Sequence, residues 1–164
     1  QIASSIRGGN NDDSINLADQ VTGLYFAQVE RFAEGSSDDV SYDIALSTSD
    51  PSNILHTEED FGNLSADQSR TGLVDNTDTT DTYQFSIGLF EGVNISLTGL
   101  SSDADLRVIQ DSNNNGLVDS GEVIGTSTRS GIGDESININ SAGDYFVQVY
   151  QFSGDTNYTL NLEL

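Results

Sequence analysis

Short runs in which apolar and polar residues alternate are the dominant pattern of this chain. Tyr145, Val147 and Val149 fall on one face of such a run, and Tyr158, Leu160 and Leu162 do the same near the end of the chain. Alternation bounded by Gly, Asn, Asp and Ser is typical of short antiparallel strands. We therefore expect strands at Thr82–Ile87, Asn94–Leu97, Leu106–Gln110, Val123–Thr126, Ser136–Ile139, Tyr145–Tyr150 and Tyr158–Leu162. Strands at spacings of about ten residues predict an all-β sandwich or barrel, and a short helix at Glu58–Leu64 is left open.

The chain also contains an internal repeat. Residues 1–17 align without a gap on residues 123–139, and residues 23–32 then align on residues 143–152. Tyr42, Ile44 and Leu46 finally meet Tyr158, Leu160 and Leu162. A repeat of this kind indicates two copies of one structural unit.

The repeat predicts the domain organisation. Residues 54–164 would form one complete unit, residues 1–48 would be the C-terminal half of a preceding unit, and residues 49–53, with the only proline, would be a linker. A half-sandwich exposes apolar faces and unpaired strand edges. We expect this half to pack on the complete unit or on the matching half of another chain.

Charge restricts the partners. The 164 residues include 27 Asp and Glu against five Lys and Arg, giving a formal net charge of −22. Such a surface repels nucleic acid and anionic lipid, and divalent cations relieve the repulsion between its carboxylates. There is no cysteine, and no apolar run approaches the roughly 18 residues of a membrane span. The absence of methionine at position 1 suggests a processed or excised product, and the composition favours an extracellular protein.

One loop has the pattern of a calcium site. Residues 111–122 match D-x-[DN]-x-[DN]-G-x5-E. Oxygens at alternate positions converge on a cation that takes six to eight of them, and a glycine allows the sharp turn. The expected ligands are Asp111, Asn113, Asn115, the Leu117 carbonyl, Asp119 and Glu122. Because strands rather than helices flank the loop, we expect a static clamp, and the alternative is an Asn-Gly hairpin that needs no metal.

Other candidate chemistry is sparse. Glu58, Glu59, Asp78 and Asp81 form a candidate second metal site. His56 is the only histidine, and no cysteine or Gly-x-Ser-x-Gly element supplies a nucleophile. We therefore expect no enzymatic activity.

Several motifs together resemble a known family. They are Asp81–Phe85, Val93–Leu100, Asp103–Leu106, the loop 111–122, Ala142–Val149 and Asn157–Leu160. The combination is similar to the bacterial pre-peptidase C-terminal domain, in the calcium-loop version that occurs in tandem copies in exported cyanobacterial and other bacterial proteins. The resemblance implies a jelly-roll-like sandwich, export, and attachment to secreted peptidases without catalysis. Relatives include the collagen-binding domains of clostridial collagenases, which bind calcium through an acidic N-terminal segment and a pair of aspartates.

These observations predict a secreted or cell-surface bacterial module that is structural or adhesive and binds Ca²⁺. The half-repeat adds the expectation of a homo-oligomer or filament, completed by other copies of the repeat. An extracellular matrix or surface ligand is a further candidate partner, whereas nucleic acid and membrane insertion are not expected. The alternative is an accessory C-terminal domain excised from a secreted peptidase, where it binds substrate or assists secretion.

Overall fold

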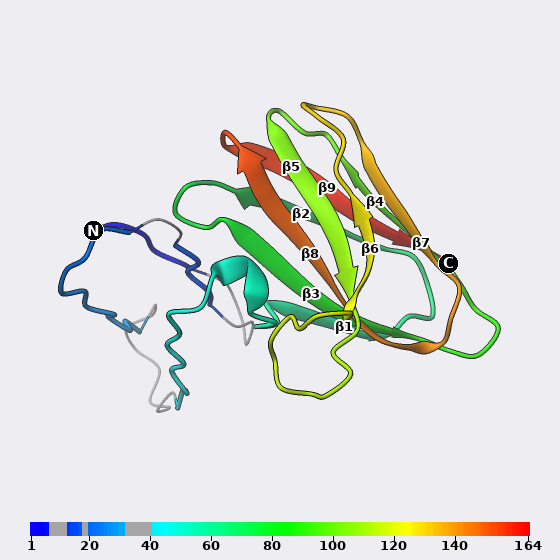
Figure 1. Ribbon diagram of the computed structural model, residues 1–164, viewed down its shortest axis with the longest axis horizontal. Coiled ribbons are helices and arrows are strands. Elements are labelled where there is room, and N and C mark those ends of the chain that lie inside the picture. The colour runs from blue at the N-terminus through cyan, green and yellow to red at the C-terminus, as the bar shows by residue number, and fades with distance from the viewer. Residues whose placement is uncertain (7–12, 18–19, 32–40) are drawn as a thin grey trace.

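The computed structural model describes residues 1–6, 13–17, 20–31 and 41–164, and from residue 54 onward these form a β-sandwich (Figure 1). One sheet has five strands in the order β1-β3-β8-β5-β6, and the other has four in the order β2-β9-β4-β7. All neighbouring strands are antiparallel except β1 and β3, which are parallel. The strands are β1 Glu59–Asn63, β2 Gln68–Val74, β3 Thr80–Ile87, β4 Val93–Thr98, β5 Asp103–Ile109, β6 Val123–Ser127, β7 Glu135–Ile139, β8 Gly143–Ser153 and β9 Thr156–Glu163. The expected all-β, predominantly antiparallel sandwich is confirmed.

The core lies between the two sheets. In β4, Val93, Ile95 and Leu97 are buried and the intervening residues are half-buried, so the strand presents one apolar face inward. Phe85 of β3 and Tyr145 of β8 pack against each other from adjacent strands, with ring centroids 5.6 Å apart. The seven strands predicted between residues 82 and 162 are all present, because alternation marks strands with one face on a core.

β1 and β2 were not predicted, and the helix left open at Glu58–Leu64 is wrong. Phe61 is the one large apolar residue of β1, an edge strand of its sheet. Its ring stacks on the Tyr83 ring of β3, with centroids 5.7 Å apart, and the Arg70 guanidinium carbon of β2 lies over the Phe61 ring, 4.9 Å from its centroid. Because these contacts come from residues distant in sequence, the local pattern of β1 carries no strand signal.

The predicted linker is structured. Asp50 caps the short 3₁₀ helix η1, Pro51–Asn53, through a 3.0 Å hydrogen bond from the Ser52 amide. The next residues lie against the loop 111–122, where the Leu55 amide donates to the Gly116 carbonyl at 2.9 Å and the Val118 amide donates to the Asn53 carbonyl at 3.0 Å.

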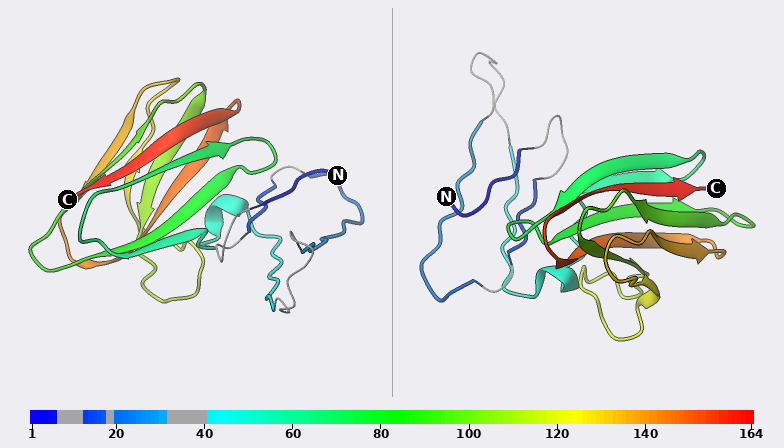
Figure 2. Two further views of the ribbon diagram at one scale, coloured as in Figure 1. Left: turned by 180° about the vertical axis from the view of Figure 1, so that it is seen from behind. Right: turned by 90° about the horizontal axis from the view of Figure 1, so that it is seen from above.

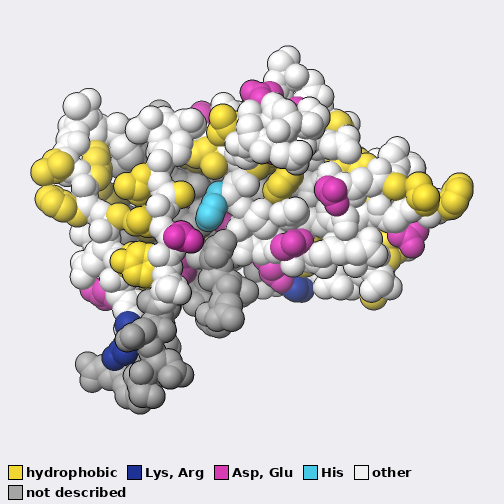
Figure 3. Space-filling model, turned by 90° about the horizontal axis from the view of Figure 1, so that it is seen from below, with side chains coloured by type: hydrophobic (Ala, Val, Ile, Leu, Met, Phe, Trp, Pro, Cys, Tyr) yellow, Lys and Arg dark blue, Asp and Glu magenta, His cyan; other side chains and the backbone are white. Residues whose placement is uncertain are grey.

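The alignment with residues 143–162 also predicts strands over residues 23–32 and 42–46, of which residue 32 lies outside the described residues. The described parts of residues 1–48 form no strand, and they lie to one side of the sandwich (Figure 2). Their apolar side chains are exposed, for example Leu24 at 83%, Phe26 at 87% and Leu46 at 82%. Figure 3 shows apolar side chains gathered over this part of the molecule. Of the packing on the complete unit that we expected, the structure shows hydrogen bonds between Asn16 and residues 78–80 at the start of β3. The assignment of residues 1–48 as a half-repeat stays a prediction from the sequence alignment.

Candidate metal centre

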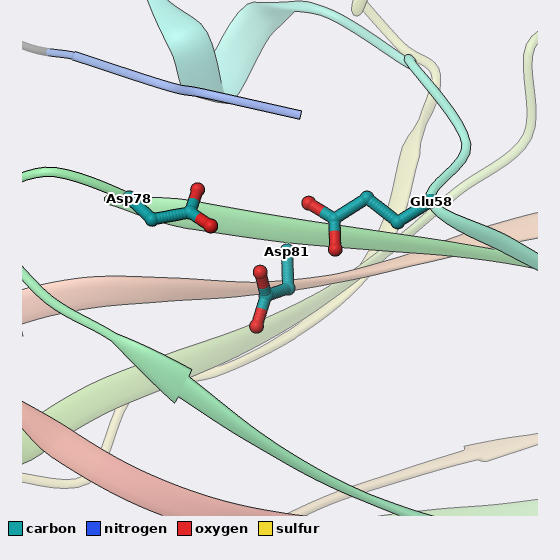
Figure 4. A group of neighbouring side chains, drawn as sticks. All are labelled: Glu58, Asp78 and Asp81. Carbon is teal, nitrogen blue, oxygen red and sulfur yellow. The ribbon is translucent and has the colours of Figure 1, made fainter. Parts of the chain in front are cut away.

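Three acidic side chains meet at one end of β3. Glu58, Asp78 and Asp81 each offer a carboxylate oxygen, and these oxygens lie within 4.8 Å of one another. Figure 4 shows the three carboxylates pointing toward a common centre. Glu58 and Asp81 are each 2% exposed, and Asp78 is half-buried. In the part of the chain that the structure describes, this is the one group of three or more His, Cys, Asp or Glu side chains with such geometry.

Parallel pairing of β1 and β3 brings Glu58 to this centre. Glu59 and Asp60 are in register with Tyr83 and Gln84, and the Glu58 amide donates to the Thr82 carbonyl at 2.8 Å. Residues separated by more than twenty positions in sequence therefore lie side by side. The parallel pair is what places an acidic residue before β1 next to the acidic start of β3.

A tight turn orients Asp78. The Asp75 carboxylate accepts hydrogen bonds from the Thr77 amide at 2.6 Å, from the Thr77 hydroxyl at 2.7 Å and from the Asp78 amide at 2.9 Å. These hydrogen bonds lower the pKa of Asp75, and the bond from the Thr77 hydroxyl makes the largest contribution. A charged Asp75 therefore stabilises the turn that presents Asp78 to the other two carboxylates.

Two buried tyrosines hold Asp81. The Tyr158 hydroxyl, from β9 of the opposite sheet, donates to Asp81 Oδ2, and the Tyr158 and Tyr83 hydroxyls are 2.7 Å apart. Burial, followed by the neighbouring Asp81 charge, raises the pKa of Tyr158 well above its ordinary value. Tyr158 therefore stays a hydrogen-bond donor, and it fixes the orientation of the Asp81 carboxylate.

Glu59 does not join this centre. Its carboxylate pairs with Arg70 of β2, whose Nε lies 2.8 Å from both oxygens and whose terminal nitrogen lies 2.5 Å from Oε1. Neighbouring residues of a strand point to opposite faces, so Glu58 and Glu59 diverge. The structure thus brings together three of the four residues of the predicted second site.

Asn16 contacts the centre and was missed by the sequence reasoning. Its side-chain Nδ2 lies 3.3 Å from Asp78 Oδ1 and 2.8 Å from the Thr80 carbonyl oxygen. Its own carbonyl accepts from the Thr79 amide at 3.1 Å. Nothing in the sequence pattern links Asn16 to residues more than sixty positions away, so this contact depends on tertiary structure.

The loop 111–122 is organised by its own polar groups. Asp111 Oδ2 accepts from the Gly116 amide at 2.9 Å, and Gly116 has the positive φ of 71° that the predicted turn requires. Glu122 is buried, and its two carboxylate oxygens accept from the Ser112 and Asp119 amides, each at 2.9 Å.

The remaining predicted ligands also bond within the loop. The side-chain amides of Asn113 and Asn115 each donate to Asp119 Oδ2 at 2.8 Å, and the Leu117 amide donates to Asn115 Oδ1 at 2.9 Å. Hydrogen bonds join Asn113 and Asn115 to Asp119, but among the described residues the loop's three acidic side chains do not form a group with the close carboxylate spacing of the centre at Glu58, Asp78 and Asp81. The same arrangement is compatible with a hydrogen-bonded hairpin, so calcium binding by this loop stays a prediction.

A separate acidic group lies on the five-stranded sheet. Burial, followed by repulsion from Asp103 and Glu135, raises the pKa of Asp105 from 3.8 to about 6. Asp105 is 5% exposed, and Glu135, which is fully buried, accepts a 2.7 Å hydrogen bond from the Arg129 amide. Because Asp105 and Glu135 are both buried, the protonation of this group bears on the stability of the sandwich.

The structure also bears on His56 and on membrane-spanning helices. His56 is exposed, and within the described residues it belongs to no cluster of metal-binding side chains. Among those same residues there is no helix with the length and apolar character needed to cross a membrane.

Comparison with known proteins supports the family resemblance. Residues 79–151, from the start of β3 through most of β8, match the model of the bacterial pre-peptidase C-terminal domain. The pre-peptidase C-terminal domain of a Bacillus anthracis collagenase superposes with a TM-score of 0.53 at 20% identity, covering 66% of this chain and 97% of that one. The chain therefore has the fold of such a domain, and the matched region includes Asp81.

Two further solved structures show weaker similarity. The g-type lysozyme inhibitor PliG of Aeromonas hydrophila, a periplasmic protein, gives a TM-score of 0.39 at 19% identity over 64% of this chain and 96% of its own. Its counterpart from Salmonella Typhimurium gives 0.37 at 16% identity over 64% and 97%. No characterised protein sequence shows a significant match to the chain.

Proposed function

We propose that this protein is a non-catalytic, calcium-stabilised β-sandwich module of an exported or cell-surface bacterial protein, with a structural or adhesive role. The observation that carries the proposal is the convergence of Glu58, Asp78 and Asp81. Carboxylate oxygens are the ligands that calcium prefers, and two of these three side chains are removed from solvent. The similarity to pre-peptidase C-terminal domains supports a non-catalytic role and export.

Electrostatics favours a cation at this centre. Two ionised carboxylate oxygens 4.8 Å apart repel by about 3.5 kcal/mol at an effective dielectric constant of about 20. All three carboxylates of the centre lie within this distance of one another, so each repels the other two when ionised. A bound Ca²⁺ would turn this repulsion into attraction.

We expect the ion to stabilise the pairing of the edge strand β1 with β3. Glu58 precedes the edge strand β1, Asp78 lies in the turn before β3, and Asp81 is the second residue of β3. An ion shared by these residues would join the two strands where their pairing begins. Glu122 and the other predicted ligands of the loop 111–122 would form a second clamp, at the connection between β5 and β6.

Thermal unfolding with and without calcium tests the proposal. For a dissociation constant of about 0.1 mM, 10 mM calcium should stabilise the protein by about 2.7 kcal/mol, which raises the Tm by roughly 10 °C. Asp78→Asn should remove the part of this response that belongs to the carboxylate triad. Asp78 is suitable because it is half-buried, so the substitution leaves the core intact.

Matched controls separate the metal centre from general charge effects. Asp144→Asn removes an exposed charge on β8 and should leave the calcium response unchanged. Glu59→Gln should also leave it unchanged, since Glu59 pairs with Arg70. The double substitution Asp111→Ala and Glu122→Ala tests the loop separately. A full calcium response in Asp78→Asn would rule out the triad, and a full response in the double variant would rule out the loop.

A second candidate function is an accessory domain of a secreted peptidase that binds the substrate. The fold similarity to the corresponding domain of a Bacillus anthracis collagenase favours it. Cosedimentation with insoluble collagen fibrils, with and without calcium, tests this function directly. Retention of the protein with the fibrils would support it, and recovery of all the protein in the supernatant would refute it for this substrate.

The proposed structural role includes association with further repeats of the same kind. Its basis is the alignment of residues 1–48 with the second half of the complete unit. The exposed apolar side chains of the described N-terminal segments support it, since apolar surface of this kind marks an interaction site.

A further inference from the structure

The outer face of the four-stranded sheet carries almost no charge. In β2, β9, β4 and β7 the side chains that alternate with the core residues point outward, and none of these outward side chains is buried. They are all Ser, Thr or Asn, except for Leu73 and Glu163. We call this surface the polar face. Glu163 is its one charged residue, although the chain has 27 Asp and Glu and a formal net charge of −22.

The register of the strands arranges the polar face in rows. In the central row, Ser69 of β2 lies opposite Asn161 of β9. Ser96 of β4 lies opposite Asn161 on one side and opposite Ser136 of β7 on the other. This row of hydroxyl and amide groups therefore crosses all four strands of the sheet.

A further row lies on each side of the central one. Thr71, Thr159 and Thr98 are in register and form the first of these rows. Asn94 and Asn138 are in register and form the second, next to the one charged residue of the face. Neighbouring strands are about 4.8 Å apart and alternate residues of one strand are about 6.8 Å apart. The three rows thus present hydroxyl and amide groups on a regular grid.

Hydrogen bonds within the polar face orient several of its side chains. The Ser69 hydroxyl donates to Asn161 Oδ1 at 2.8 Å, and Asn161 Nδ2 donates to the Ser96 hydroxyl oxygen at 3.5 Å. The Ser136 hydroxyl donates to Asn94 Oδ1 at 3.1 Å. Each hydroxyl and each amide can make more than one hydrogen bond, so these oriented groups keep the capacity to bind a ligand.

The chemistry of the polar face favours an uncharged partner that is rich in hydroxyl groups. Ser, Thr and Asn side chains both donate and accept hydrogen bonds, as sugar hydroxyls do. An anionic polymer would be repelled by the net charge of −22, and a cationic one would find its carboxylates on other surfaces. Protein interfaces are enriched in aromatic residues and depleted in Ser, whereas Leu73 is the one large apolar residue of this face.

We propose that the polar face of β2, β9, β4 and β7 binds a neutral polysaccharide. The proposal rests on the adhesive role proposed above, and it names the surface and the class of partner. Each hydrogen bond to a sugar replaces one to water, so its net contribution to affinity is small. A single sandwich therefore binds weakly, and several linked sandwiches bind one polymer much more tightly.

Retention of the full chain on insoluble polysaccharides tests the proposal. The probes are four neutral polysaccharides, namely cellulose, chitin, agarose and mannan, with carboxymethyl cellulose as the anionic counterpart of the first. We expect retention on at least one neutral polysaccharide and none on carboxymethyl cellulose, because the anionic polymer is repelled by the acidic protein.

A pair of substitutions that keep the side-chain shape tests the surface. Asn138→Asp combined with Asn157→Asp removes two exposed amide donors of the polar face and adds two charges there. We expect about tenfold weaker binding, because lost hydrogen bonds and an unpaired charge in the contact are both costly. Asn53→Asp combined with Asn63→Asp adds the same charges at exposed positions outside the polar face and should bind like the original protein.

Three results would overturn the proposal. The first is no retention on any of the four neutral polysaccharides, and retention on collagen fibrils alone would then preserve the adhesive role with a different partner. The second is equal binding by the two double variants, which would place the binding surface elsewhere. The third is a dimer, detected by sedimentation velocity, that the polar-face variant dissociates, since a second copy would then be the partner. Circular dichroism checks the folding of each variant, and thermal unfolding measures the calcium response, so the metal proposal and this proposal fail independently.

Discussion

Asp105→Asn should make the sandwich more stable at neutral pH and should change how its stability depends on pH. Asp105 lies on β5, is 5% exposed, and has a pKa raised from 3.8 to about 6 by burial and by the charges of Asp103 and Glu135. Tyr150, on the neighbouring strand β8, faces the same carboxyl group and partly offsets the rise through a hydrogen bond. Asparagine keeps the shape of the side chain and removes the charge.

The magnitude follows from the two pKa values. Below pH 3.8 Asp105 is protonated in both the folded and the unfolded states, so it contributes no dependence on pH. Between pH 3.8 and about 6 the unfolded state releases its proton and the folded state retains it, so stability falls as pH rises. Above about pH 6 the whole penalty is present. A difference of about two pKa units corresponds to about 3 kcal/mol.

Urea unfolding of both proteins from pH 3.5 to pH 8, in the presence of a chelator, measures this effect. The stability of Asp105→Asn relative to the original protein should increase by about 3 kcal/mol between about pH 4 and pH 7. Most of the change should fall between pH 4 and pH 6. Asp144→Asn, at an exposed position, serves as the control and should give a nearly flat difference. A difference for Asp105→Asn that varies with pH by less than about 0.5 kcal/mol would refute the assigned environment of Asp105.

Two predictions concern the packing of the sandwich. Phe85→Ala, at a side chain that is 1% exposed, should lower the free energy of unfolding by about 3–5 kcal/mol, whereas Phe90→Ala, at a fully exposed side chain, should change it by less than about 0.5 kcal/mol in the same urea titration. Equal effects of the two would contradict the placement of β3. Gly72→Ala should cost about 1–3 kcal/mol, because the added Cβ would lie 2.2 Å from the Tyr158 hydroxyl oxygen. Thr71→Ala, at the exposed neighbouring position, is its control, and a tolerated alanine at position 72 would show that Tyr158 does not lie over this glycine.

The sequence alone predicted the strands that face the core on one side. In β4 and β9 every second residue faces the opposite sheet, and this alternation can be seen in consecutive residues of the sequence. The loop 111–122 was likewise readable, because its candidate ligands are neighbours in sequence. The internal repeat also required no structure, since it is a property of the residue order.

Tertiary structure decided what depends on distant partners. β1 and β2 owe their existence to pairing with β3 and β9, and their own residues show little alternation. The choice of Glu58 over Glu59 as a member of the acidic centre follows from the parallel pairing of β1 with β3, which turns one carboxylate toward Asp81 and the other toward Arg70. Asn16 reaches Asp78 only through the folded arrangement.

The N-terminal half-repeat, residues 1–48, shows most clearly the difference between what a sequence pattern predicts and what tertiary contacts decide. Its sequence contains the alternation of strands that are buried in the complete unit, and sequence reasoning therefore predicted strands for it. Its described segments form none, whereas in the complete unit the corresponding strands β6–β9 are all hydrogen-bonded to β2–β5. Alternation specifies which face of a strand can be buried, but only a neighbouring strand can satisfy its backbone amides and carbonyls.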